Sequence, residues 1–378
     1  MKKIAVVGKG TAGCMSAAHW SIIEDVEVDW YFDPNIKTQA VGEGSNLTLP
    51  FSLNETVNFS PREFDKVDAS LKTGIYKDGW GKGKKPFLHD FPSPMVSIHF
   101  SAVKLQDHIE KCMMNKNNVN IKRMNVDPSN LDASFIVDAS GKPSDYSEFV
   151  QSSYIPVNSV YVTQCYWDHP RFNYTLTIAR PYGWVFGIPL QNRCSIGYMY
   201  NKDINTLEEV QEDVKNIFEQ YNLIPSEDTN AFSFNNYKRM ENYNENIVYN
   251  GNASFFLEPL EATSFGNVSA INHQSSLHWF RGQGKKSVER HYNSVIDATE
   301  NIIMMHYAAG SDYVSDFWEY AEERGRKCLE NANPGLRALI NGTHESLPMT
   351  PELEAMLYSW WQLSWEQNSI ELGLRNGN

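Results

Sequence analysis

The chain opens with a strand, a glycine turn and a helix, and this pattern constrains the fold more than any other feature. Residues 3–7, KIAVV, are mostly apolar and β-branched, as in a buried parallel strand. The next residues, GKGTAG at 8–13, have the G-x-G-x-x-G spacing and lead into helix formers. Such glycines allow a tight turn and let a pyrophosphate approach the helix N-terminus. We therefore predict a dinucleotide-binding unit with cofactor contacts from Gly8, Gly10, Thr11, Ala12 and Gly13.

Two further strands extend this unit. VEVDWYF is followed by Asp33, about 20 residues after the last glycine, where an acidic side chain would accept a ribose hydroxyl. SFIVDASG at 134–141 runs into Asp138 and Gly141, and flavoproteins of the hydroxylase superfamily carry a similar strand with both residues close to the flavin. About 100 residues then separate two strands of one domain, which favours FAD over NAD by analogy.

Composition excludes several classes of protein. A net charge of −13 opposes binding of the chain as a whole to phosphate backbones. The five cysteines are scattered, with no pair or Cys/His cluster at metal-ligand spacing, which predicts a reduced protein without a metal site. The apolar run 4–7 is too short for a signal peptide, and no run is long enough to cross a membrane. We expect a cytoplasmic protein with no nucleic-acid, membrane or metal partner.

Six segments resemble, in the same order, segments of the flavin-dependent halogenases related to tryptophan halogenase. They are GKGTAG at 8–13, VGEGSNLTLP at 41–50, SLKTGIYKDGW at 70–80, FLHDF at 87–91, GWVFGIPL at 183–190 and FLEPLEATSFG at 256–266. The last hundred or so residues match no segment that we can assign to a family. The resemblance implies that Gly42 and Glu43 also contact FAD. It further implies that FADH2, O2 and a halide ion, whether chloride, bromide or iodide, yield hypohalous acid that halogenates an electron-rich aromatic substrate.

The resemblance also implies two catalytic residues. Lys72 matches the lysine that guides the hypohalous acid, and Glu261 matches a glutamate that can pair with that lysine and accept the proton released by the ring. An alternative is that Lys72 is an ordinary solvated lysine, as expected of its neighbours Lys66, Lys77, Lys82, Lys84 and Lys85. Its register with Gly74, Ile75 and Trp80 favours the catalytic role.

Other matched residues concern the halide and the substrate. Thr263 and Ser264 match a pair associated with halide binding, although the family usually has glycine in place of Ser264. Glu258 is expected to be structural, near the turn before Pro259.

Four residues are predicted to face the substrate. His89 and Phe91 match rings that stack on the indole in tryptophan-specific members, and the alternative is an edge strand with an exposed histidine. Trp184 and Phe186 match the W-x-W-x-I-P wall between substrate and flavin, with phenylalanine replacing the second tryptophan.

These observations predict an α/β fold of the flavin hydroxylase/halogenase type. The expected parts are a Rossmann-like FAD-binding domain at 1–150 and 250–272, a substrate-side mixed β-sheet and helix at 151–249, and a helical C-terminal region at 273–378. A separate reductase should supply FADH2, since we find no second G-x-G-x-x-G for a nicotinamide cofactor. The tryptophans at 360, 361 and 365 are expected in helix packing or an oligomer contact, with a wall of the aromatic pocket as the alternative.

Two other functions stay open at this point. A flavin-dependent aromatic hydroxylase (monooxygenase) would use the same fold but would need neither Lys72 nor a halide site. A non-catalytic flavin-binding protein would bind FAD without productive use of oxygen. Dependence on halide separates the first of these from a halogenase.

Overall fold

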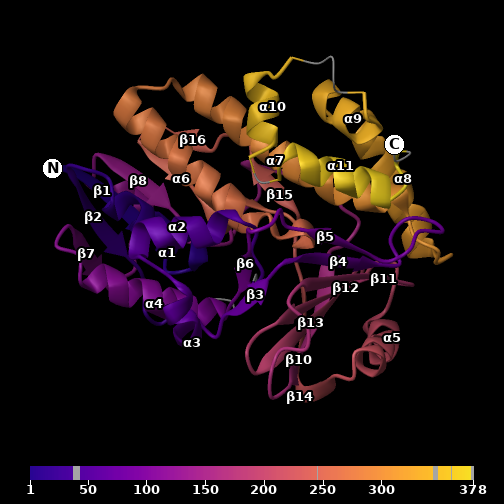
Figure 1. Ribbon diagram of the computed structural model, residues 1–378. Helices are drawn as coiled ribbons and strands as arrows, with labels where there is room; N and C mark the ends of the chain where they lie inside the picture. Colours follow the sequence, from indigo (N-terminus) through magenta and orange to yellow (C-terminus); the bar gives the residue numbers. More distant parts are fainter. Residues whose placement is uncertain (37–42, 245, 344–347, 359, 376–378) are drawn as a thin grey trace.

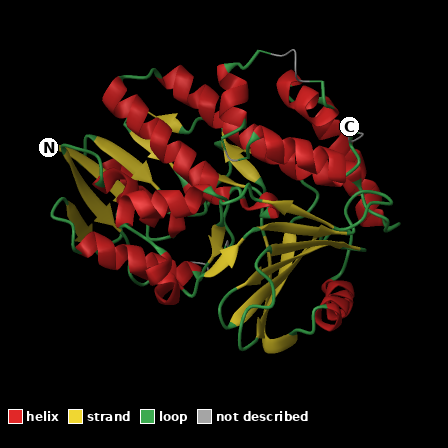
Figure 2. Cartoon of the chain, in the orientation of Figure 1, coloured by secondary structure: helices red, strands yellow, loops and turns green. Residues whose placement is uncertain are grey.

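Two large β-sheets and a set of C-terminal helices form the molecule (Figure 1). This computed structural model describes residues 1–36, 43–244, 246–343, 348–358 and 360–375. The N-terminal sheet lies on the left of the view and the second sheet at the lower right, while the C-terminal helices run along the top (Figures 1 and 2).

The first sheet has the order β16-β17-β8-β1-β2-β7 and is parallel except at β16. The predicted first strand is β1 (Lys2–Val7), which pairs with β2 (Val26–Tyr31) and β8 (Phe135–Asp138). The other strands are β7 (Val119–Lys122), β16 (Tyr243–Asn244) and β17 (Ile247–Tyr249). Helix α1 (Thr11–Ser21) follows the glycine turn and packs against α4 (Ala102–Met114) and α6 (Ser264–Arg281). The α/β prediction is therefore confirmed.

The three glycines of the turn meet different physical constraints. Gly8 has a φ of 114°, and a Cβ there would lie 2.1 Å from the Ala139 carbonyl oxygen. A Cβ on Gly13 would lie 2.1 Å from the Gly8 carbonyl oxygen, so only glycine lets α1 rest on β1. At Gly10 an added Cβ would meet no atom within 4 Å. Gly8 and Gly13 are thus required by packing, whereas Gly10 faces open space.

The second sheet has the order β14-β10-β13-β12-β11-β4-β5. Its strands are β4 (Gly74–Asp78), β5 (Phe87–Asp90), β10 (Ser159–Tyr166), β11 (Thr175–Arg180), β12 (Gly183–Pro189), β13 (Arg193–Tyr200) and β14 (Ile224–Ser233). Helix α5 (Leu207–Gln220), capped by Thr206, contacts β10 and β13. The sequence predicted a substrate-side mixed β-sheet and helix at 151–249. However, β4 and β5 join it from the N-terminal segment, while β16 and β17 pair with the first sheet, because strand pairing depends on partners distant in sequence.

Smaller elements connect the two sheets. Strand β3 (Ser70–Lys72) pairs with β6 (Ser97–His99), and β15 (Tyr237–Arg239) lies between β9 (Phe149–Gln151) and β18 (Phe255–Phe256). The short helices before the C-terminal region are α2 (Thr48–Val57), α3 (Phe64–Val67), η1 (Pro61–Glu63), η2 (Pro128–Asn130), η3 (Gly251–Ala253) and η4 (Leu260–Ala262). Together β3, β6 and η4 bring the N-terminal and central segments to one place.

The C-terminal region is helical, as predicted. It contains α7 (Lys285–Ala309), α8 (Asp316–Glu330), α9 (Pro334–Asn341), α10 (Pro351–Met356) and α11 (Gln362–Glu371). Helix α7 packs against α8 and α10, and α11 contacts β5 of the second sheet. The C-terminal helices therefore lie against the strands that carry the predicted site.

The glycine turn gives a direct test of this packing. We expect Gly13→Val to lower the free energy of unfolding by about 3 kcal/mol or more, because its side chain collides with the Gly8 backbone. Gly10→Ala is the matched control and should cost about 1 kcal/mol or less. Guanidinium unfolding followed by circular dichroism measures both. Equal losses in the two variants would contradict the packing role of Gly13.

Candidate active site

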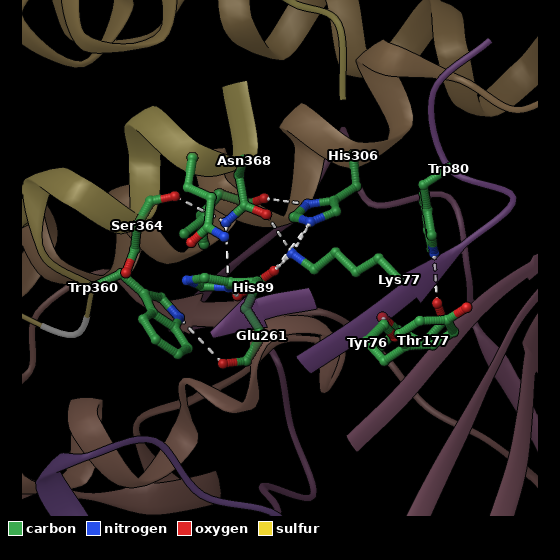
Figure 3. A network of polar contacts seen from close by, with 12 residues as sticks. Tyr76, Lys77, Trp80, His89, Thr177, Glu261, His306, Trp360, Ser364 and Asn368 are labelled. Atoms are coloured by element: carbon green, nitrogen blue, oxygen red, sulfur yellow. Dashed lines mark hydrogen bonds and ion pairs between the residues drawn. The ribbon is translucent and has the colours of Figure 1, made fainter. Parts of the chain in front are cut away.

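Glu261 lies at the centre of a group of buried polar side chains (Figure 3). It belongs to η4, directly before α6. Glu261 and Ala262 have φ values of 70° and 51°. Non-glycine residues rarely enter this left-handed region, and each such residue costs about 1–3 kcal/mol. The turn must therefore be held by tertiary contacts, and the Glu261 carboxylate makes several of them.

The carboxylate forms a buried ion pair with Lys77 of β4. An ammonium group has three donors, and three acceptors surround Lys77 Nζ: Glu261 Oε1, Asn368 Oδ1 at 2.5 Å and His306 Nε2 at 2.6 Å. His306 Nδ1 donates to the Ile302 carbonyl oxygen at 2.8 Å, which leaves Nε2 as an acceptor. Segments β4, η4, α7 and α11 thus meet at the Lys77 ammonium (Figure 3).

The surroundings keep the glutamate ionised and the histidines neutral. Burial alone would raise the pKa of Glu261, but the charge of Lys77 outweighs burial and, with smaller effects of His89 and His306, holds this pKa well below its ordinary value. Burial, with a contribution from Lys77, lowers the pKa of His306 to about 4. Burial also lowers the pKa of His89, whose Nδ1 lies 3.2 Å from Glu261 Oε2. The positive charge that compensates Glu261 is therefore that of Lys77.

Lys72 of β3 is also fully buried, but it is not paired. Its Nζ has no hydrogen-bond partner among the described residues. It lies 5.7 Å from the Phe91 ring centroid, and a Cβ built on Gly44 would be 3.9 Å from it. Burial lowers the pKa of Lys72 to about 7, with Glu261 opposing this shift and Lys77 adding to it. The expected Lys72–Glu261 ion pair is therefore wrong for this structure, because Lys77 takes the carboxylate. The expectation that Lys77 is a solvated surface lysine is also wrong.

The predicted substrate rings His89 and Phe91 are both buried, so the alternative of an exposed histidine is wrong. Both face the indole of Trp360, with ring centroids 4.8 Å and 5.9 Å away. The Trp360 indole N–H donates to the Glu261 carbonyl oxygen at 3.1 Å. Trp365 is buried as well, whereas Trp361 is 43% exposed. Trp360 therefore lies within the site. The three tryptophans differ in burial and in contacts, so they do not share one role.

Glu258 and Trp184 form a second buried contact near the site. Glu258 Oε2 accepts hydrogen bonds from the Trp184 indole at 2.9 Å and from the Tyr307 hydroxyl at 3.0 Å. Burial raises the pKa of Glu258 to about 8, although both donors oppose this shift. Phe186 lies beside Trp184, with ring centroids 6.1 Å apart. We expected a structural role for Glu258, and in the structure its carboxylate fixes the position of the Trp184 indole.

The predicted halide residues stand at the start of α6. Thr263 is buried, while Ser264 is exposed. Among the described residues, no side chain caps this helix N-terminus, whose first amides carry the positive end of the helix dipole.

The comparisons with known proteins bear on this site. A family model described as tryptophan halogenase matches residues 3–124 and 96–335. The chain belongs to the tryptophan halogenase family. The two matched ranges include Lys72, Lys77, Glu261 and His306.

Sequence relatives are members of the same family. The tryptophan 6-halogenase SttH of Streptomyces toxytricini is 27% identical over 161 residues, which are 40% of this chain and 29% of the relative. The tryptophan 7-halogenase RebH of Lentzea aerocolonigenes is 28% identical over 156 residues, again 40% of this chain and 29% of the relative. The aligned part is therefore less than a third of the length of these halogenases.

Solved structures match over much more of the chain. The SttH structure has a TM-score of 0.80 at 18% identity and covers 98% of this chain and 90% of that chain. BrvH, a flavin-dependent halogenase from Brevundimonas sp. BAL3, has a TM-score of 0.75 at 16% identity, with 99% and 90% covered. These matches confirm the predicted fold, including its helical C-terminal region.

In this family fold, the predicted cofactor residues lie around the carboxyl edge of the first sheet. The Asp138 carboxylate accepts a hydrogen bond from the Ser140 amide at 2.9 Å, and Gly141, with a φ of 112°, faces open space like Gly10. Asp33 accepts hydrogen bonds from the Asn35 backbone and side chain at 2.8 and 3.0 Å. Strands β1 and β8 place Val7 opposite Asp138, so the two glycine-containing turns are neighbours.

Two predicted cofactor residues come from the loop before α2. Glu43 is buried and accepts hydrogen bonds from Arg193 at 2.5 Å and from the Ser195 hydroxyl at 2.7 Å. Its carboxylate is therefore already engaged within the chain. Gly42 lies outside the described residues.

Sequence reasoning missed Lys77, His306 and Asn368. Lys77 follows Ile75 by two residues on a strand, so both side chains share one face, and Ile75 is a core residue. His306 is a lone histidine in the apolar run IIMMHYAA. Either signal could have suggested a buried polar group. Asn368 lies in the part of the chain that resembled no family segment.

The Lys77–Glu261 pair yields a stability prediction. We expect Lys77→Met to lower the free energy of unfolding by about 3–5 kcal/mol, because it leaves a buried carboxylate without its counter-charge. Lys82→Met removes a lysine whose side chain is 61% exposed and should change stability by less than about 1 kcal/mol. Urea unfolding at neutral pH compares them. A Lys77→Met variant as stable as Lys82→Met would refute the pairing.

Glu258 yields a prediction about pH. The pKa of Glu258 rises on folding, so the folded state binds this proton more tightly than the unfolded state does. The stability that the bound proton contributes at low pH is therefore lost as the pH rises toward 8. Glu258→Gln stays neutral and keeps an acceptor oxygen for Trp184 and Tyr307. The variant should match the wild type near about pH 5 and exceed it by a few kcal/mol above about pH 8. Unfolding free energies measured across this range test the prediction, and parallel curves would contradict it.

Proposed function

We propose that this chain is a flavin-dependent halogenase that acts on an electron-rich aromatic substrate. The observation that carries the proposal is the buried Lys72 amine, which is unpaired among the described residues and lies in the field of Glu261. An unpaired buried lysine costs folding free energy and is retained most readily where chemistry needs it. Membership of the tryptophan halogenase family supports halogenation as that chemistry.

The glycine turn fits FAD. Gly10 leaves open space at the start of α1, which has no side-chain cap, so its first amides are suited to an anionic phosphate. The residues proposed to hold FAD are those of the turn together with Asp33, Glu43, Asp138 and Gly141. Bound as FADH2, the cofactor would supply with O2 the oxidising power that turns a halide into hypohalous acid. A separate reductase would provide the reduced flavin.

The protein groups have distinct proposed roles. The amides and side chains of Thr263 and Ser264 bind the halide at the positive end of α6. Lys72, whose pKa is about 7, is present at neutral pH both as ammonium and as amine. The ammonium can hydrogen-bond the hypohalous oxygen, and the amine can accept the halogen.

Glu261 is the proposed acceptor of the ring proton. Its Oε1 is held by Lys77, while no described residue donates a well-formed hydrogen bond to Oε2. The carboxylate is ionised, so Oε2 has a lone pair available for the proton that the ring releases on substitution. His89, Phe91, Trp184 and Phe186 form the apolar surroundings proposed for the substrate. The relatives named as tryptophan halogenases make an indole the first substrate class to test.

We expect Lys72→Ala to retain flavin binding but to lose halogenated product by at least about a hundredfold, because the oxidant is no longer guided to the ring. Mass spectrometry of indoles and phenols incubated with protein, FAD, a flavin reductase, NADH, oxygen and bromide measures the product through its bromine isotope doublets. Lys82→Ala, an exposed lysine nearby, is the control and should match the wild type. Full activity of Lys72→Ala would refute the lysine assignment. Oxygenated products without bromine would instead support the hydroxylase.

A further inference from the structure

Trp360 brings an indole of the chain itself into the site. It lies in the connection between α10 and α11 and is 4% exposed. Its ring faces His89 and Phe91 at centroid distances of 4.8 Å and 5.9 Å. These are the two side chains that the sequence predicts to stack on the aromatic substrate. The predicted stacking surface is therefore covered by Trp360.

The polar end of Trp360 is fixed as well. Its N–H donates to the carbonyl oxygen of Glu261, the proposed proton acceptor, at 3.1 Å (Figure 3). Trp360 also lines the same small void as Thr263, one of the two proposed halide residues. One indole thus touches the stacking residues and the backbone of the acid.

The two neighbouring tryptophans lack this arrangement. Trp365 is equally buried and lines the same void, but its indole nitrogen has no hydrogen-bond partner among the described residues. Trp361 is 43% exposed. Trp360, unlike Trp365, therefore combines ring contacts with His89 and Phe91 and a hydrogen bond to the Glu261 backbone.

We infer that Trp360 occupies the position of the aromatic ring that the enzyme halogenates, and that an external substrate must displace it. The inference rests on the proposed function for the identity of the reaction. The burial of His89 and Phe91 supports it, because an external ring cannot stack on either side chain while both stay covered. Trp360 then competes with external aromatic ligands for this position. The competition determines which ligands bind and with what affinity.

Binding of small aromatic probes without flavin tests the position. We expect Trp360→Ala to bind indole, and to bind it at least about tenfold more tightly than benzothiophene, which has the same shape but no N–H for the Glu261 carbonyl. Trp365→Ala should bind the two probes equally, because the indole it loses has no hydrogen bond. Trp361→Ala should bind neither probe better than the wild type. Calorimetric titration and thermal shifts report these affinities in any variant that remains folded.

Turnover with the complete system tests displacement. We expect Trp360→Ala to lower the KM for indole by about tenfold or more with little change in kcat, because the competitor is gone. Trp361→Ala should match the wild type. An unchanged KM, or equal binding of indole and benzothiophene by Trp360→Ala, would overturn the inference. If neither the wild type nor Trp360→Ala makes brominated indole, the proposed function fails, while the probe comparison still decides whether Trp360 fills an indole site.

Discussion

The buried Lys77–Glu261 ion pair is the interaction on which the centre of this molecule depends. Glu261 sits in a turn whose backbone is unfavourable for a non-glycine residue, and its charge is removed from water. Both costs require a compensating partner of good geometry. Lys77 meets this requirement because each of its three donors has an acceptor, drawn from η4, α7 and α11. The pair thus joins the second sheet to the turn before α6 and to two C-terminal helices.

This pairing also determines the state of Lys72. Two buried lysines lie near one carboxylate, and the carboxylate can neutralise only the one that it contacts directly. Lys77 is that lysine, so Glu261 offsets only part of the effect of burial on Lys72, which loses its proton more easily than a surface lysine. Under the proposed function, this arrangement leaves Lys72 available to act on the halogenating species.

Local signals in the sequence identified much of this arrangement. The strand, the glycine spacing and the following helix are encoded within the first residues of the chain, and they form as predicted. Lys72, Glu261, His89 and Phe91 were found through ordered motifs, and the structure brings their segments together. The partner of Glu261 could not be found this way, since Lys77 is 184 residues away in sequence and lies five residues from a lysine with the better motif match. Trp360 and Asn368 come from segments that resemble no motif, so their place in the site follows only from the packing of α11 and of the connection before it.

The distances in sequence between the members of the centre have a consequence for how the protein forms. Lys77 is bonded to residues that follow it by 184, 229 and 291 positions. Closing such long loops is unfavourable until most of the fold is in place, and the contacts form late. A partly folded or newly synthesised chain can therefore pair β1, β2, β7 and β8, which all lie within residues 2–138, and still lack the centre at Glu261. Under the proposed function, the ability to direct a strong oxidant would arise only once these distant segments have come together.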